Sequence, residues 1–311
     1  METSLRGYAV TDTAIANGNY VLGEALGHGG TAHVFRARRS SDSQWLAAKI
    51  LPIHNIENPA ALLARYQQIG RLEHPHILPI VDVGFEQETF YVISPIAEEG
   101  SLRQALQRGQ IHRKLAIELI VQIADALEYA HRRGIVHLDV KPANILLARN
   151  RRPLLGDFGL IQPAPGPTGR ARVRGTPAYM APEQCTLRPT GPATDQYGLA
   201  ITSFELLTGR RPFAADSPDE VLRRQVFDTP PVASAVCADL PRDLDQALSR
   251  ALAKEPRERF PSVQAFAAAL AKDMATATPG APSHGQPLTG EDRTLDVLTL
   301  ELRGGASGNR M

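Results

Sequence analysis

The chain has 311 residues, 43% hydrophobic and 22% charged, which is enough apolar material for one large domain or two packed lobes. Its 34 Lys and Arg nearly balance 33 Asp and Glu, and a formal net charge of +1 excludes a dominant role in binding nucleic acid or acidic membranes. The two cysteines, Cys185 and Cys237, are too few and too isolated for a disulfide framework or a zinc site. No apolar run approaches the roughly 20 residues that span a bilayer, and the first 19 residues lack the apolar core of a secretory signal. We therefore expect a soluble, cytoplasmic protein with no transmembrane segment.

Sequence patterns divide the chain into four regions. Residues 1–19 show no sustained periodicity, which predicts a flexible leader. Residues 20–96 contain short apolar runs that predict a β-rich lobe, interrupted by one helical pattern over residues 59–73. Residues 97–274 show apolar residues at three- and four-residue spacing, which predicts a larger helical lobe. Residues 275–311 are rich in Pro, Gly, Thr and Ser, which predicts a flexible tail. Within this tail, the short pattern LDVLTLEL could form a strand or a docking segment.

The first motif is a glycine-containing loop, residues 26–34 (LGHGGTAHV), between two strand-like segments. Glycines let a turn close over phosphates, with backbone N–H groups facing them and no Cβ in the way. By itself, the motif fits an ordinary hairpin about equally well. It is not a Walker-type loop, because no Gly-Lys-Ser/Thr follows, and it is not a dinucleotide-binding turn, because a strand follows it.

Lysine is rare in this chain, with five Lys against 29 Arg. One of the five, Lys49, lies in an apolar strand pattern, fifteen residues beyond Val34. A lysine among apolar neighbours needs an anionic partner or loses its charge. A lysine on a solvent-facing side of the strand is the alternative, but the glycine loop just upstream favours a nucleotide phosphate as its partner.

The strongest signal is the segment 137–144 (HLDVKPAN), which follows a helical pattern. Asp139 can orient and deprotonate a hydroxyl, and Lys141 can neutralise a transferring phosphate. Asn144 can supply an oxygen to a metal, and Asp157, in the sequence DFG thirteen residues later, could hold the same metal. Each residue alone could be an ordinary turn residue, whereas the ordered set is rare by chance.

Together, these motifs resemble the eukaryotic-type protein kinases, and most closely the bacterial serine/threonine kinases. The resemblance covers about residues 20–274, and the motifs occur in the family's order. An Ala-Pro-Glu motif ends at Glu183, and in the family this glutamate pairs with an arginine that corresponds to Arg259. Lys141 and Thr176 occupy positions typical of the serine/threonine class. Asp195, in the pattern TDQYGLA, is a further match.

The resemblance implies an α+β, two-lobed protein-kinase fold: a small lobe with an antiparallel β-sheet and one main helix, and a larger, mostly helical lobe. It implies ATP and Mg²⁺ as cofactors. Asp139 and Lys141 would be catalytic, and Asn144 and Asp157 would hold Mg²⁺. The residues implied to bind the nucleotide are Leu26, Gly27, His28, Gly29, Gly30, Thr31, Ala32, His33, Val34, Ala47, Lys49, Pro95, Ala97 and Leu146.

Within that set, the resemblance implies distinct contacts with adenine. Val34 and Ala47 would lie on one side of the base and Leu146 on the other. The carbonyl of Pro95 and the N–H of Ala97 would bind its edge, so the missing N–H of the proline would cost nothing.

One departure from the family concerns the small-lobe helix. The position that normally holds a glutamate paired with Lys49 falls on Arg65, with Ile69 at the apolar position one turn later. An arginine facing Lys49 would repel it, and an active form would need another anchor for Lys49 or its direct capture by phosphates. A catalytically impaired pseudokinase, acting as an ATP-binding scaffold or regulator, is therefore the alternative function.

A second departure is Leu138, which replaces the arginine that clamps a phosphorylated activation loop in the family. The expected activation loop, residues 160–180, has no serine, and its only threonines are Thr168 and Thr176. Thr176 belongs to the Gly-Thr element, for which we expect a structural role. We therefore predict a serine/threonine kinase that does not depend on activation-loop phosphorylation.

The expected partners are protein substrates and no nucleic acid. A small-molecule phosphotransferase is disfavoured, because in the family the residues that correspond to Glu183 and Arg259 support a groove that binds protein substrates. Many bacterial relatives carry a membrane anchor and a sensor after the kinase domain, and this chain shows neither pattern. An activating or sensor partner protein is therefore a further expectation.

Overall fold

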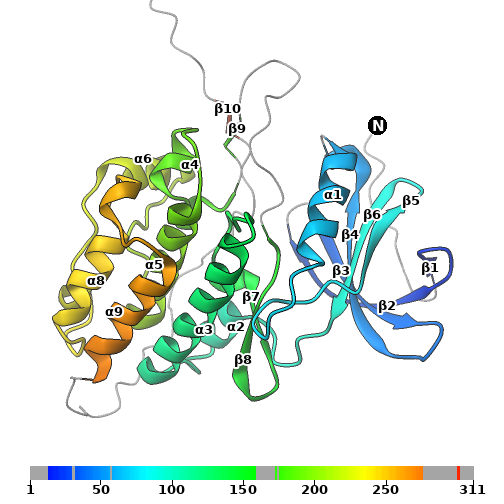
Figure 1. Cartoon of the computed structure of the whole chain (residues 1–311), viewed down its shortest axis with the longest axis horizontal. Helices are drawn as coiled ribbons and strands as arrows, with labels where there is room; N and C mark the ends of the chain where they lie inside the picture. The colour runs from blue at the N-terminus through cyan, green and yellow to red at the C-terminus, as the bar shows by residue number, and fades with distance from the viewer. Residues whose placement is uncertain are drawn as a thin grey trace, which may run out of the picture.

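Two lobes make up the computed structural model, with the small lobe on the right of Figure 1 and the large lobe on the left. Their arrangement confirms the predicted α+β, two-lobed fold. In the part of the chain that the structure describes, no helix is both long and apolar enough to cross a membrane. The described residues are 13–29, 32–56, 58–158, 172–173, 175–275 and 300–301.

The small lobe is built on an antiparallel sheet with the strand order β1-β2-β3-β4-β6-β5. Successive residues of a strand point to opposite faces, so each strand can serve two clusters. On one face Ala48 and Ile93 are fully buried, and on the other face Leu51 and Phe90 pack toward helix α1. The strands are β1 (Thr13–Ile15), β2 (Tyr20–Gly29), β3 (Ala32–Arg39), β4 (Trp45–Pro52), β5 (Asp82–Glu86) and β6 (Thr89–Pro95).

Helix α1 (Pro59–Ile69) is the predicted small-lobe helix. It begins where the Asn58 side chain accepts a hydrogen bond from the N–H of Ala61 at 3.0 Å, and a proline occupies its first position. Leu62 and Tyr66 are four residues apart, share one side of the helix and are buried against the sheet. This apolar side fixes the rotation of α1 about its own axis.

Strand β1 lies inside the range 1–19, for which we expected a flexible leader, so that expectation is wrong for residues 13–19. The chain turns at Ala16 and Asn17, both with φ near +55°, and their N–H groups donate to the carboxylate of Glu86. A three-residue edge strand is too short to give a periodic signal, which is why the pattern missed it. The residues before 13 lie outside the described part.

The large lobe is centred on helix α5 (Pro192–Thr208), which is buried on nearly every side. It contacts α3, α8 and α9, and the polar side chains that it buries, such as Asp195 and Gln196, are hydrogen-bonded inside the lobe. It ends at Gly209, whose φ of 72° suits a glycine cap. The other helices are α2 (Leu102–Gln107), α3 (Arg113–His131), α4 (Pro182–Cys185), α6 (Pro218–Phe227), α7 (Ala233–Val236), α8 (Asp243–Ala251) and α9 (Val263–Ala275).

Two short sheets complete the described structure. Strands β7 (Ile145–Ala148) and β8 (Arg152–Leu155) form an antiparallel pair beside the link between the lobes. Strand β10 (Leu300–Glu301) pairs with β9 (Arg172–Val173), so part of the LDVLTLEL pattern is a strand. The rest of the predicted flexible tail from residue 276 lies outside the described residues. Short 3₁₀ helices lie at Ile53–Asn55, Pro142–Asn144, Arg149–Arg151, Pro177–Tyr179 and Pro256–Glu258.

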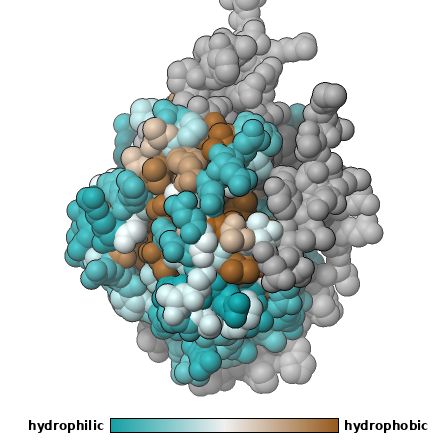
Figure 2. Space-filling view, turned by 90° about the vertical axis from the view of Figure 1, so that its right-hand side faces the viewer, coloured by the Kyte–Doolittle hydropathy of each residue, from teal (hydrophilic) through white to brown (hydrophobic). Residues whose placement is uncertain are grey.

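Figure 2 looks onto the outer side of the small lobe, where apolar side chains are visible between hydrophilic ones. More than half of a folded protein's surface is ordinarily contributed by apolar atoms. This face therefore does not by itself indicate a binding site.

A buried ion pair joins two distant parts of the large lobe. Both Glu183 carboxylate oxygens accept hydrogen bonds from Arg259, each at 2.8 Å, which confirms the pairing expected from the resemblance. Burial alone would raise the pKa of Glu183, but these bonds outweigh it and hold the pKa below its ordinary 4.5. The pair therefore contributes its full stabilisation at neutral pH and loses it as the pH falls below 4.5.

Arg259→Leu should lower the free energy of unfolding by about 3–5 kcal/mol at pH 7, because it leaves the Glu183 charge buried without a partner. Urea denaturation followed by circular dichroism measures this loss. Arg188→Leu is the matched control, because Arg188 pairs with Glu255 at the surface and its loss should cost at most about 1 kcal/mol. Equal losses in the two variants would contradict a structural role for the buried pair.

Candidate active site

The predicted catalytic loop, residues 137–144, connects the segment after α3 to strand β7. Its three polar side chains meet as expected from their spacing. Asp139 Oδ2 lies 2.9 Å from Lys141 Nζ and accepts a hydrogen bond of 2.8 Å from Asn144 Nδ2. Asn144 Nδ2 also donates to the Asp139 carbonyl at 2.8 Å, which fixes the orientation of the amide. The loop therefore presents a carboxylate, an ammonium and an amide oxygen within one small volume.

Lys141 is buried, and its charge is balanced locally. Besides Asp139, its Nζ donates to Thr176 Oγ1 at 2.5 Å. A buried ammonium needs such polar partners, and Lys141 has a carboxylate and a hydroxyl within hydrogen-bond distance. Thr176 is also buried, as expected for a structural threonine, and joins the catalytic loop to the segment before the Ala-Pro-Glu motif.

The loop backbone is held by a residue to which the sequence assigned no role. Asp195, on α5, has a fully buried side chain and accepts 2.7 Å hydrogen bonds from the backbone N–H groups of His137 and Leu138. His131 Nε2, on α3, lies 2.7 Å from the same carboxylate. Leu138 has a φ of 67°, a conformation that costs a non-glycine residue about 1–3 kcal/mol. These bonds offset that strain.

His137 links the catalytic loop to the DFG segment. Its ring is fully buried, with Nε2 2.9 Å from the carbonyl oxygen of Gly156 and Nδ1 3.2 Å from the N–H of Asp139. Burial lowers the pKa of His137, so the ring is neutral at pH 7 and accepts the Asp139 N–H through Nδ1. Its ring lies 4.6 Å from that of Phe158, which is itself buried.

Lys49 projects from β4 and forms an ion pair across the lobes. Its Nζ lies 2.6 Å from Asp157 Oδ1, and the Asp157 side chain is about half exposed, at 46%. Burial disfavours the Lys49 charge, but the Asp157 carboxylate outweighs this effect and raises the pKa of Lys49. In turn, Lys49 holds the pKa of Asp157 below its ordinary value, although partial loss of solvent around the carboxylate acts in the opposite direction. Both groups are therefore charged at neutral pH.

The residues implied to contact adenine lie on elements that meet near the link between the lobes. Val34 pairs with Lys49 in the sheet, Ala47 pairs with Ser94, and Leu146 bridges to Ser101. All three are partly exposed.

At the link itself, Pro95 ends β6 and offers its carbonyl. Within the described residues, the Ala97 N–H has no hydrogen-bond acceptor and is available to a ligand. Glu99 N donates to Leu147 O at 2.9 Å, and Leu147 N donates to Gly100 O at 2.8 Å, so the link is fixed to β7.

The glycine loop forms the end of the β2–β3 hairpin. The register pairs Gly27 with Val34, His28 with His33, and Gly29 with Ala32. Gly30 and Thr31, at its tip, lie outside the described residues, as does the glycine of the DFG motif. Leu26, just before the loop, is 46% exposed.

The side chains of Asn144 and Asp157 are chemically suited to bind a magnesium ion. Mg²⁺ prefers hard oxygen ligands and is commonly held by one or two carboxylates together with substrate phosphates. Because Asn144 uses Nδ2 to bind Asp139, its Oδ1 is the atom left for a metal. Asp157 supplies a carboxylate that is charged and partly exposed.

Arg65 does not face Lys49, contrary to our concern from the sequence. Its Nη2 donates to the carbonyl oxygen of Val136 at 2.6 Å, so it joins α1 to the residue before the catalytic loop. Burial lowers the pKa of Arg65, but an arginine remains charged in proteins. The expected repulsion between Arg65 and Lys49 is therefore absent.

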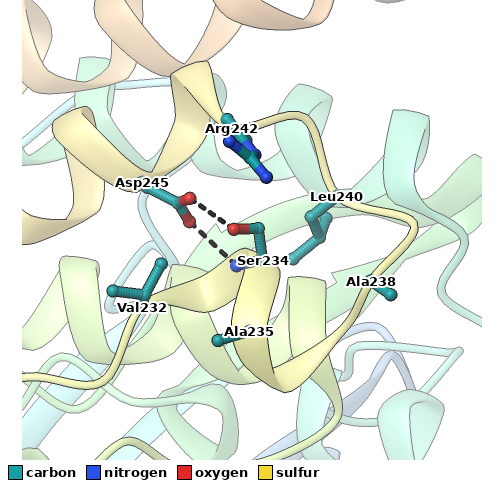
Figure 3. Close-up of a pocket in the computed structure, with 7 residues that line it drawn as sticks. All are labelled: Val232, Ser234, Ala235, Ala238, Leu240, Arg242 and Asp245. Atoms are coloured by element: carbon teal, nitrogen blue, oxygen red, sulfur yellow. Dashed lines mark hydrogen bonds between the residues drawn. The ribbon is translucent and has the colours of Figure 1, made fainter.

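A separate hollow lies between α7 and α8, away from every candidate catalytic residue. Figure 3 shows Ser234 directed at Asp245, with Ser234 Oγ and N donating to the carboxylate at 2.5 and 2.8 Å. Because Ser234 and Asp245 are hydrogen-bonded to each other, neither is left unpaired to bind a ligand in the hollow. Its lining residues are Val232, Ser234, Ala235, Ala238, Leu240, Arg242 and Asp245.

Arg65→Leu should lower the free energy of unfolding by about 1.5–3 kcal/mol, because it removes a charged hydrogen bond to a backbone carbonyl. Urea denaturation without nucleotide measures the change. Gln67→Leu, at an exposed position of the same helix, is the control and should stay within about 0.5 kcal/mol. Unchanged stability in Arg65→Leu would show that the bond to Val136 is not formed in solution.

Comparisons with known proteins identify the family of the chain. The protein kinase domain family matches residues 20–270. The serine/threonine-protein kinase PknB of Mycolicibacterium smegmatis is 34% identical over 88% of this chain and 45% of its own length. PknD of Mycobacterium tuberculosis is 36% identical over 86% of this chain and 41% of its own length, so the chain spans less than half of these relatives.

A solved structure shows the same fold. The PknI kinase domain of Mycobacterium tuberculosis, crystallised as a cysteine-to-alanine mutant, superposes with a TM-score of 0.70 at 28% identity, covering 86% of this chain and 98% of that one. The family match covers most of the chain. The chain belongs to the protein kinase family.

Proposed function

We propose that this chain is a serine/threonine protein kinase that transfers the γ-phosphate of ATP to serine or threonine hydroxyls of proteins. The observation that supports this most is the meeting of Asp139, Lys141 and Asn144 beside the Lys49–Asp157 pair. Each of these groups is charged or polar and partly or wholly buried, which a purely structural role does not require. The kinases among its relatives are named for the same activity.

Each side chain has a role that follows from its surroundings. Asp139, held by Asn144, would orient the substrate hydroxyl and accept its proton. Lys141 would place its ammonium beside the transferring phosphoryl group while remaining paired with Asp139. Lys49 would bind the phosphates upstream of the transferred group. Mg²⁺, held by Asn144 and Asp157, would neutralise the charge that develops on the phosphate oxygens.

In this proposal the nucleotide binds between the small-lobe sheet and the β7–β8 pair, beside the link between the lobes. Val34, Ala47 and Leu146 would enclose adenine, and the Pro95 carbonyl and Ala97 N–H would bind its edge. Residues 26–34 would cover the phosphates with backbone N–H groups. Since ATP is the phosphate donor, we place the reaction in the cytoplasm, where ATP is made available to signalling enzymes.

The pseudokinase alternative rested on Arg65. Because Arg65 binds the Val136 carbonyl, it does not compete with Lys49 for its partners. No observation in the described part of the chain favours a catalytically impaired protein. Protein substrates, rather than small molecules, are favoured by the Glu183–Arg259 pair, which supports the segment that forms a protein-substrate groove in the family.

We also propose that activity does not require phosphorylation of the activation loop. Leu138 has no charge with which to bind a phosphate, and its N–H is already used by Asp195. The catalytic loop is held by Asp195 and Thr176, which need no modification. An activating or sensor partner protein remains a part of the proposal, since regulation must then come from elsewhere.

Thr168→Ala should leave the rate of substrate phosphorylation within about twofold of wild type, because position 138 has no arginine that could bind a phosphate on the loop. Radiolabelled phosphate transfer to a generic basic protein measures the rate, and mass spectrometry reports the loop's phosphorylation. A large loss, reversed by Thr168→Glu, would show that the loop is a phosphorylation switch.

Asp139→Asn should reduce transfer of labelled phosphate from ATP by at least about 100-fold, because the amide cannot accept the hydroxyl proton. ATP with Mg²⁺ should still raise the melting temperature of this variant, since the nucleotide-binding residues are intact. If wild type and variant both fail to transfer phosphate while ATP raises both melting temperatures, the pseudokinase alternative holds instead.

A further inference from the structure

Tyr66, the residue after Arg65, is the polar residue that α1 buries against the sheet. It is only 4% exposed and packs with Leu51, Phe90 and Val92. Its ring lies 5.3 Å from that of Phe90. Because neighbouring helix positions point about 100° apart, the same helix sends Arg65 to Val136 and Tyr66 to the sheet.

Lys49 lies on that same face of the sheet. It is two residues before Leu51 on β4, and its register partner on β6 is Val92. Residues two apart on a strand, and partners across two strands, share a face. Tyr66 therefore covers the part of the sheet from which Lys49 projects. Consistent with this, burial raises the pKa of Tyr66 to about 12, while the Lys49 charge acts in the opposite direction.

The hydroxyl of Tyr66 has no use in the packing. Its oxygen is fully buried and has no hydrogen-bond partner within the described residues. A buried polar atom without a partner destabilises the fold, and native proteins keep few of them. Phenylalanine would fill the same space without this cost. The oxygen is therefore best explained by a contact that forms in another state of the site.

We propose that Tyr66 is a positioning residue for Lys49, whose ammonium donates a hydrogen bond to the Tyr66 hydroxyl when nucleotide is bound. The inference rests on the proposed function, because it requires Lys49 to leave Asp157 and bind phosphates. The ammonium has three donors, so one can bind tyrosine while the others bind phosphate oxygens. The flexible four-carbon stem of lysine allows the ammonium to change partners while β4 and α1 stay in place.

A tyrosine suits a chain that lacks a carboxylate at position 65. A neutral hydroxyl accepts one hydrogen bond and leaves the positive charge of Lys49 uncompensated, so the lysine keeps its full attraction for phosphates. Arg65 meanwhile fixes α1 to the large lobe through Val136. In this proposal Tyr66 takes over the contact with Lys49 that the helix glutamate makes in the family, and Arg65 serves a different contact.

Tyr66→Phe removes only this oxygen and tests the proposal. In nucleotide-free protein its melting temperature should be unchanged or higher, because an unpartnered buried atom is lost. Its Kd for ATP with Mg²⁺, from displacement of a fluorescent ATP analogue, should rise about 3- to 10-fold, the effect of one hydrogen bond. The KM for ATP should rise by a similar factor, with the KM for the protein substrate unchanged.

Two further variants separate positioning from packing. Tyr91→Phe is the matched control, because Tyr91 is a tyrosine of β6 on the opposite face of the sheet, and it should leave ATP affinity unchanged. In a Lys49→Met background, Tyr66→Phe should cause no further loss of ATP affinity, because the partner is gone.

Wild-type ATP affinity in Tyr66→Phe, or an equal loss in the Lys49→Met background, would overturn the proposal while leaving the kinase activity standing. If the wild-type protein binds ATP but transfers no phosphate, the proposed kinase function is refuted. The role of Tyr66 is then still decided by the ATP-binding measurements on the variants. Wild-type protein that binds no ATP would refute both.

Discussion

The buried carboxylate of Asp195 fixes the backbone of the catalytic loop, and the rest of the candidate site depends on it. A carboxylate without solvent is costly unless it is fully hydrogen-bonded. Here three donors, from two backbone N–H groups and from His131, meet that need. Because those N–H groups belong to His137 and Leu138, satisfying Asp195 also imposes the backbone conformation that directs Asp139 to its neighbours.

The same helix that carries Asp195 must lie very close to the loop. Gly198, one turn further along α5, makes this possible, because a Cβ at that position would lie 3.1 Å from the Val140 carbonyl oxygen. The large-lobe core therefore positions the loop through both charge and close packing. His137 extends the arrangement to the DFG segment, since its neutral ring joins the Gly156 carbonyl to the Asp139 N–H.

Residue spacing predicted most directly the contacts between residues that lie close together in the sequence. The spacing of Asp139, Lys141 and Asn144 brings them together within a single loop, and periodicity separated the two lobes. Among contacts over long distances in sequence, the resemblance predicted the pairing of Glu183 with Arg259, whereas the anchoring role of Asp195 became visible only in the fold. The direction of Arg65 was missed because a one-residue step turns a helix by about 100°, which spacing alone does not resolve.

The charges around Lys49 differ from those of a site that carries the usual helix glutamate. Lys49 and Asp157 balance each other, as do Lys141 and Asp139, so these four groups have no net charge. A glutamate at position 65 would add a negative charge, whereas Arg65 adds a positive one, a difference of two units. Because Arg65 binds the Val136 carbonyl and does not face Lys49, the main consequence is that Lys49 has no second carboxylate beside it. Lys49 is therefore held by the DFG carboxylate of the large lobe and not by a carboxylate of α1, while Arg65 joins α1 to the catalytic loop.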